Sequence, residues 1–308
     1  MHLRNKPWLA LALIAAGTLI VLYAVDRFQH RFVHAGPDLL RLLPVDDATL
    51  FYAQVDVLRQ AGMLTLFADS KSAQDAEYRS FVRATQFDYS KDVDALAGSV
   101  ASDRVLLALK GRFDWFRIRT YVLQQGGACT PETCALRGTR NGDWIGITRI
   151  QPDVLGVSFG TRPGLSSAIH PGQQAVAPPL PTEAVWVKLA PSVLKNPGSL
   201  PFALRIFAIS VQPADSVVIG LAGATPGSAD AFEINLYAQC PSASTADTIR
   251  NQLQIETKML KLELAHEHQQ PSPADLTGLL TAGTFSTNGK EVTGEWPVRK
   301  ELLKTLQQ

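Results

Sequence analysis

The sequence predicts an α+β fold in which an N-terminal transmembrane helix precedes two similar domains, each a mainly antiparallel sheet with helices packed on one face. Three observations predict this fold. An uncharged run occupies residues 8–25, pairs of strand-like segments separated by short turns recur along the chain, and one Leu-Pro segment has a later counterpart. Strands joined by short turns pair as antiparallel neighbours. At about 150 residues per domain, the 308 residues accommodate two domains.

The composition sets the broad class of the protein. Hydrophobic residues make up 46% and charged residues 19% of the chain, which excludes an intrinsically disordered protein and allows a sizeable core. The 29 basic and 28 acidic residues leave a formal net charge of +1. Because this balance provides no basic surface for a phosphate backbone, we do not expect a nucleic-acid partner.

The uncharged run at residues 8–25, from Trp8 to Val25, predicts a membrane span. A run of about 18 apolar residues is near the minimum for crossing a bilayer as a helix. Arg4 and Lys6 precede the run and favour a cytoplasmic N-terminus. We therefore expect an uncleaved signal anchor, a single pass through the bacterial inner membrane, and the bulk of the chain in the periplasm.

A cleaved signal peptide is the alternative to this anchor. Residues 22–24 read Leu-Tyr-Ala, a poor cleavage site because small residues are preferred there. No cysteine occurs before Cys129, which excludes a lipoprotein-type cleavage. Whether the segment stays as an anchor or is cleaved as a signal peptide, the rest of the chain is expected to be exported.

A segment near the start of the exported part has a counterpart in the second half of the chain. Residues 42–62 and 180–198 both carry Leu-Pro, an acidic residue before Ala, an apolar strand, and Val-Leu followed by a base. The later elements follow in the same order, so each half is predicted to run strand, helix, two strands, helix, two strands, helix. The expected strand pairs are 95–101 with 104–110, 144–149 with 153–159, 216–222 with 231–239, and 284–287 with 291–296.

The helices of this pattern have recognisable starts. Asp114 is expected to cap the middle helix of the first half, and Ser242 or Ser244 the long helix of the second. A short helix is expected near Pro163, and a last helix over 298–306 with Pro297 in its first turn. The predicted organisation is a cytoplasmic tip and anchor at 1–25, a stalk at 26–41, a first domain at 42–176 and its internal duplicate at 177–308.

Two short motifs carry a family resemblance. Leu43 to Ala48 reads Leu-Pro-x-Asp-x-Ala, and Lys110 to Trp115 reads Lys-Gly-Arg-Phe-Asp-Trp. With an early strand and helix, these resemble bacterial single-span, membrane-anchored exported proteins that are classed as a domain of unknown function. The resemblance implies membrane anchorage and an extracytoplasmic location, and it provides no activity or site residue to carry over.

Cys129 and Cys134 predict a disulfide across a tight loop. They are separated by four residues, and an exported chain meets an oxidising compartment. A free thiol pair and a metal site are the alternatives, although a metal would need two further ligands that the neighbouring sequence does not provide. Cys240, at the end of a predicted strand, is expected to be a buried apolar residue.

Residues 156–160 read Gly-Val-Ser-Phe-Gly and fit the nucleophile elbow of serine hydrolases, with Ser158 as the nucleophile. Three features oppose this interpretation. The strand is expected to pair in a hairpin instead of a parallel sheet, the next helix is short and begins near Pro163, and the duplicate position at 294–297 reads Gly-Glu-Trp-Pro. A strand that ends in Ser and Gly at a turn is the simpler interpretation.

Two further clusters have simpler structural interpretations. Ser192 and Lys195 fit the S-x-x-K pattern of penicillin-recognising enzymes, but the companion motifs S-D-N and K-T-G are absent from the sequence. Glu263 and His266 could share one helix face as metal ligands, with Glu267 and His268 beside them. The simpler reading is the solvated end of a long helix. We expect no metal and no cofactor.

Two function hypotheses remain. The first is a membrane-anchored extracytoplasmic binding or scaffolding protein without catalytic activity, which contacts another envelope protein or a cell-wall component through its sheets or domain cleft. The alternative is an envelope serine hydrolase that uses Ser158. We prefer the first, because no candidate nucleophile comes with a complete catalytic constellation.

Overall fold

The computed structural model describes residues 36–60, 64, 76–138, 142–170, 181–196, 207–223 and 230–306. Its strands are β1 (Thr49–Gln54), β2 (Val93–Ala101), β3 (Arg104–Gly111), β4 (Ala128–Cys129), β5 (Thr133–Arg137), β6 (Trp144–Gln151), β7 (Val154–Gly160), β8 (Val185–Lys188), β9 (Ser216–Gly223), β10 (Asp230–Gln239), β11 (Thr284–Asn288) and β12 (Glu291–Arg299). Its helices are η1 (Gly36–Leu42), α2 (Val55–Gln60), α5 (Ala76–Thr85), α6 (Tyr89–Asp92), α7 (Trp115–Gln124), η2 (Leu165–Ala168), α8 (Pro191–Lys195), α10 (Ala243–His266), α11 (Leu276–Thr281) and α12 (Lys300–Leu306).

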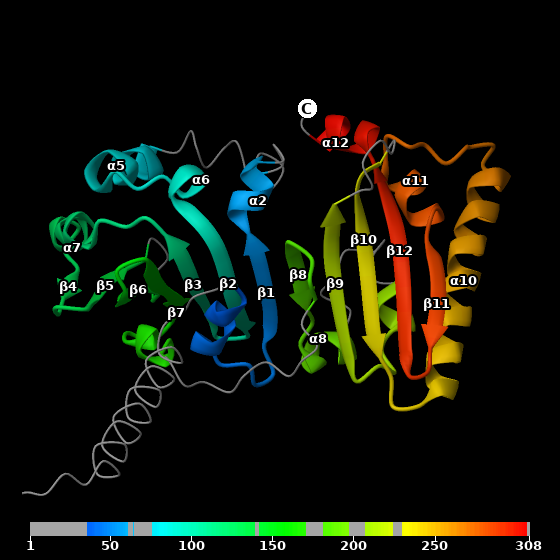
Figure 1. Cartoon of the computed structure of the whole chain (residues 1–308), viewed down its shortest axis with the longest axis horizontal. Coiled ribbons are helices and arrows are strands. Elements are labelled where there is room, and N and C mark those ends of the chain that lie inside the picture. Colours follow the sequence, from blue (N-terminus) through cyan, green and yellow to red (C-terminus); the bar gives the residue numbers. More distant parts are fainter. Residues whose placement is uncertain are drawn as a thin grey trace, which may run out of the picture.

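All of these strands belong to one antiparallel sheet (Figure 1), in the order β11-β12-β10-β9-β8-β1-β2-β3-β7-β6-β5-β4. The mixed α+β class with a mainly antiparallel sheet is therefore confirmed. The halves do not have separate sheets, because β1 pairs directly with β8. Outward from this pair, the order is β2, β3, β7, β6 on one side and β9, β10, β12, β11 on the other.

The register of β1 and β8 joins the halves symmetrically. Phe51 lies opposite Val187, Leu50 lies opposite Lys188, and Tyr52 lies opposite Trp186. The pairing is antiparallel, with Phe51–Val187 and Tyr52–Trp186 as its two central pairs. Phe51 and Val187 each lie three residues after the alanine of the two Leu-Pro segments, so equivalent positions of the halves meet, as in a two-fold contact.

The two main core clusters lie on opposite faces of the sheet. In the first half, Tyr52 and its cross-strand neighbour Ala97 face η1, whose leucines are buried. In the second half, Val217 and Leu236 belong to the core that α10 covers. Gly220 on β9 lies opposite Trp186, which belongs to the core of the first half. Because side chains alternate along a strand, Val217, three residues before Gly220, points to the opposite face of the sheet. The two core clusters therefore pack against different sides of the shared sheet.

Some boundaries differ from those expected. Residues 36–41, expected within a stalk, form η1, and Leu39 and Leu40 are 0% and 1% exposed. Pro297 lies inside β12, opposite Glu233, and the last helix begins after Arg299. Proline is tolerated there because β11 pairs with β12 only as far as Glu295, so one side of the strand needs no N–H donor at Pro297.

The predicted helix caps are present. The Asp114 side chain accepts a hydrogen bond from the backbone N–H of Arg117 at the start of α7. Of the two serines proposed for α10, Ser242 is the cap, accepting from the N–H of Thr245. Both satisfy N–H groups that lack partners within the helix.

The predicted membrane span, from Trp8 to Val25, lies outside the residues described. Within the described part of the chain, no helix has both the length and the apolar character needed to cross a bilayer.

Candidate apolar binding site

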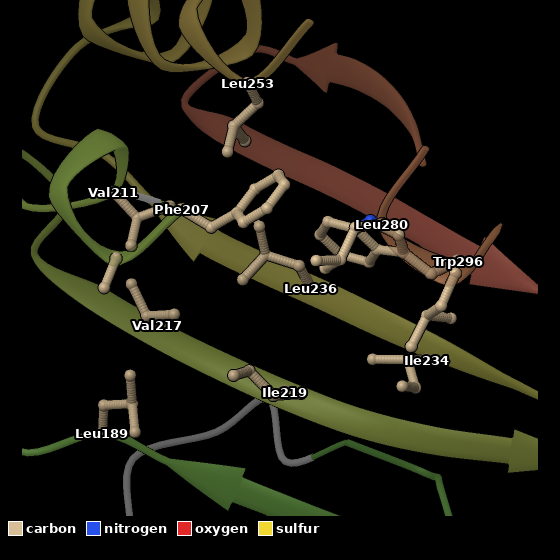
Figure 2. A pocket seen from close by; sticks show the side chains of 12 residues that line it. Leu189, Phe207, Val211, Val217, Ile219, Ile234, Leu236, Leu253, Leu280 and Trp296 are labelled. Carbon is tan, nitrogen blue, oxygen red and sulfur yellow. The ribbon is translucent and has the colours of Figure 1, made fainter. Parts of the chain in front are cut away.

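A cavity of about 310 Å³ lies in the second half, between the sheet and the helices that cover it (Figure 2). All the side chains that line it are apolar, apart from the indole nitrogen of one tryptophan. They are Leu189, Phe207, Ala208, Val211, Val217, Ile219, Ile234, Leu236, Leu253, Leu279, Leu280 and Trp296.

Strand periodicity builds the floor of this pocket. Val217 and Ile219 are two residues apart on β9, and Ile234 and Leu236 are two apart on β10, so both pairs point to one face. Asn235 lies between Ile234 and Leu236 on β10, so its side chain points to the other face of the sheet. There it donates to the Glu183 carboxylate at 3.3 Å. The alternation therefore gives the same strands an apolar face and a polar face.

Three segments form the opposite wall. Leu253 projects from α10, and Leu279 and Leu280 come from α11. The helical residues 207–210 contribute Phe207, whose ring lies between Leu253 and Leu236 in Figure 2. These elements are far apart in the sequence, so the pocket forms only when the second half has folded.

Trp296 closes one end of the pocket. It is 9% exposed, and its ring makes edge contacts with Phe207 and Phe285 at centroid distances of 6.2 and 5.2 Å. Its Nε1 is buried without a hydrogen-bond partner among the described residues. A Cβ at position 283 would lie 2.5 Å from Nε1, so the indole requires the glycine there. The ring is held by packing, and its N–H donor remains unused.

A buried carboxyl group links two walls of the pocket. Ser210, next to Val211, donates its hydroxyl to Oε1 of Glu256 at 2.6 Å, and Glu256 lies one turn after Leu253 on α10. Burial raises the pKa of the Glu256 carboxyl, against the opposing effect of hydrogen bonds from Ser210 and Gln252. The contact fastens the segment that carries Phe207 to α10.

The pocket reaches solvent beside β9, where the side chain of Ile219 is 39% exposed. None of the lining side chains is ionisable, and none is a nucleophile. The site can therefore hold an apolar group by removing it from water, but its walls provide no acid, base or nucleophile for a reaction.

The structure contains the predicted disulfide between Cys129 and Cys134, with an S–S distance of 2.02 Å. The two residues lie opposite each other in the β4–β5 pair at one end of the sheet. Cys240 is a free cysteine, 1% exposed, in the core of the second half. Burial, with a smaller effect of Asp215, raises the pKa of its thiol.

Ser158 lies within β7, not at a strand-to-helix turn. It is 1% exposed and sits opposite Leu106 on β3 and Gly146 on β6. A Cβ at position 146 would lie 2.5 Å from its Oγ and 3.0 Å from Oγ of Ser166, so the hydroxyl fills space that the glycine leaves. Among the described residues, no Asp or His side chain forms a hydrogen bond with Ser158.

The remaining sequence candidates are not brought together. Ser192 and Lys195 lie on α8, where the N–H of Ser192 donates to the Asp47 carboxylate at 3.3 Å. Glu263 and His266 are exposed at the end of α10. In the described part of the chain, no group of three or more His, Cys, Asp or Glu residues could hold a metal ion.

Sequence reasoning did not find the pocket. Its strand residues were visible as apolar alternation, but alternation gives a buried face without showing that a space remains above it. Two further features of the sequence bear on the pocket. Gly283 leaves room for the indole of Trp296, and the Leu-rich segment 276–281, capped by Asp275, provides two of the lining side chains.

The chain was compared with known proteins. No protein-family model matches it, and no curated protein does. Among solved structures, crystal form I of TP0453 is 13% identical, with a TM-score of 0.47 over 89% of this chain and 98% of that one. Crystal form III is 12% identical, with a TM-score of 0.45 over 87% of this chain and 97% of that one.

Proposed function

We propose that the protein is a non-catalytic binding protein whose second half takes an apolar ligand, or the apolar part of a larger one, into the pocket. The observation that carries this proposal is the cavity of about 310 Å³ with its apolar walls and an opening beside Ile219. Ligand pockets are typically mostly apolar and begin near this size.

The physical chemistry of the cavity favours a ligand with a hydrocarbon chain or ring. Dry apolar cavities of about 150 Å³ already bind benzene or xenon, so a larger one has room for a longer group. Each methylene transferred from water contributes roughly 0.8 kcal/mol. Because no charged side chain lines the pocket, a charged head group would remain at the opening, in water.

The serine hydrolase has less support. A nucleophile must reach substrate and contact a base, and Ser158 is 1% exposed without a hydrogen bond to an Asp or His of the described residues. The walls of the pocket contribute no replacement for these groups.

We further propose that the protein works in the bacterial envelope, anchored by residues 8–25, as two duplicated halves. The uncharged run supports the anchor, and the Cys129–Cys134 disulfide fits an oxidising compartment. The common strand order on the two sides of the β1–β8 pair supports the duplication. Another envelope component that carries or receives the apolar ligand is the proposed partner.

A brominated acyl chain tests the proposed ligand class. The full chain in lipid nanodiscs is titrated with 12-bromododecanoic acid, which quenches tryptophan fluorescence on contact. We expect saturable quenching, because Trp296 lines the pocket.

The variant Ala208→Phe fills the cavity and should abolish the saturable quenching, since Ala208 lines it. Ile209→Phe is the matched control: the neighbouring side chain is 46% exposed, does not line the pocket, and should leave quenching unchanged. Equal quenching of both variants would show that the acyl chain binds elsewhere.

A further inference from the structure

Helix α10 carries apolar side chains on two opposite faces. Ile249, Leu253 and Leu264 are buried against the sheet. On the outer face, Ile255, Met259 and Leu262 are 60%, 61% and 56% exposed. Large aliphatic side chains scattered singly on a surface need no explanation, but three on one helix face indicate a contact.

The spacing of the outer residues is that of a coiled-coil seam. Ile255, Met259 and Leu262 are separated by four and then three residues, which corresponds to positions d, a and d of a heptad. The same register places Lys258 at position g and Glu263 at position e. The outer face is therefore an apolar seam with a base along one flank and an acid along the other.

The charges on the flanks select a partner and an orientation. Lys258 and Glu263 are exposed, and neither forms an ion pair with another described residue. In a parallel pair of identical helices, position g of one helix meets position e of the next heptad in the other. Lys258 of each copy would then meet Glu263 of the other, whereas an antiparallel two-fold pair would bring each charge against its own kind.

We infer that the outer face of α10 pairs in parallel with the same face of a second copy of this chain. Two apolar seams are removed from water, and two Lys–Glu contacts close the flanks. Three apolar side chains per copy make a small interface, so the dimer is weak and depends on concentration. The contact leaves the pocket unblocked, because Leu253 lines it from the opposite side of the helix.

Disulfide cross-linking of the full chain in native membranes tests the pairing. Leu262→Cys introduces the accessible thiol, since Cys129 and Cys134 are joined and Cys240 is buried. In a parallel pair, position 262 lies opposite itself, so oxidation should give a covalent dimer. Lys261→Cys, exposed but outside the seam, is the matched control and should remain monomeric.

Co-expression of differently tagged Ile255→Cys and Leu262→Cys chains separates the two orientations. Disulfides between like variants support the parallel pair, and disulfides mainly between unlike variants would overturn it. A lipid surface over this face would leave Leu262→Cys uncross-linked and would also overturn the proposal.

Charge exchange tests the choice of partner. In the Leu262→Cys background, Lys258→Glu alone or Glu263→Lys alone should lower the cross-linking yield about tenfold. Combining Lys258→Glu with Glu263→Lys in one chain should restore the yield, because the contact is formed again with its charges reversed. Lys261→Glu makes the same charge change off the seam and should have no effect. Equal losses in all three single variants, without rescue, would contradict the Lys258–Glu263 contact.

Discussion

Tyr52 and Trp186 lie opposite each other across the β1–β8 pair, with ring centroids 6.0 Å apart. The side chains are 3% and 2% exposed, and Trp186 belongs to the core cluster of the first half although it comes from the second. Burial, with a smaller effect of Asp56, raises the pKa of the Tyr52 hydroxyl to about 12. The halves therefore share both backbone pairing and core packing, so we expect them to unfold together.

Replacing Trp186 with alanine should destabilise both halves at once. Truncating a buried aromatic residue typically costs about 3–5 kcal/mol, because apolar burial is lost and a cavity remains. Denaturant unfolding followed by circular dichroism should show one transition at a lower midpoint. A second transition that stays at the wild-type midpoint would show that the halves are independent.

Removing the Cys129–Cys134 disulfide should cost about 2 kcal/mol in the chain-entropy model, since the closed loop is short. The double variant Cys129→Ser/Cys134→Ser should therefore unfold at a lower denaturant concentration. In wild-type protein purified without reductant, mass spectrometry should find both thiols protected from alkylation. The buried Cys240 should become labelled only after unfolding.

Much of the strand pattern is predictable from local sequence. β10 alternates Ile234 and Leu236 with Asn235 and Tyr237, and the Asn288-Gly289 turn joins β11 to β12, with Gly289 at a φ of 60°. Period-two patterns and turn residues depend on neighbours a few positions away, so one sequence suffices to find them.

The merged sheet and the pocket depend on contacts between distant segments. Nothing near Trp186 shows that it will pack beside Tyr52 instead of within its own half. From the sequence, Leu39 and Leu40 are expected at the end of a stalk, whereas in the structure η1 places them in the core of the first half. The pocket requires Phe207, Leu253 and Leu280 to meet above one face of the sheet, which local periodicity does not encode.

The carboxyl of Glu256 should make stability depend on pH. Burial raises its pKa, so the folded state favours the protonated form more than the unfolded state does. Its stabilising contribution is fully present below the pKa of the unfolded chain and is lost as pH rises through the folded pKa. Between pH 4 and 8, the denaturant midpoint of unfolding should fall less steeply with rising pH in Glu256→Gln than in the wild type. The same slope in both proteins would contradict this role of Glu256.

Ser158 should behave as a core residue. Ser158→Ala removes one hydroxyl and should change the free energy of unfolding by less than about 2 kcal/mol. Ser158→Leu should cost about 1–3 kcal/mol or more, because the space between Gly146 and Ser166 is already filled. A fluorophosphonate probe should label neither wild type nor Ser158→Ala, since the hydroxyl is buried without a base among the described residues. Stoichiometric labelling of wild type that disappears in Ser158→Ala would establish an activated serine and favour the hydrolase over the binding protein.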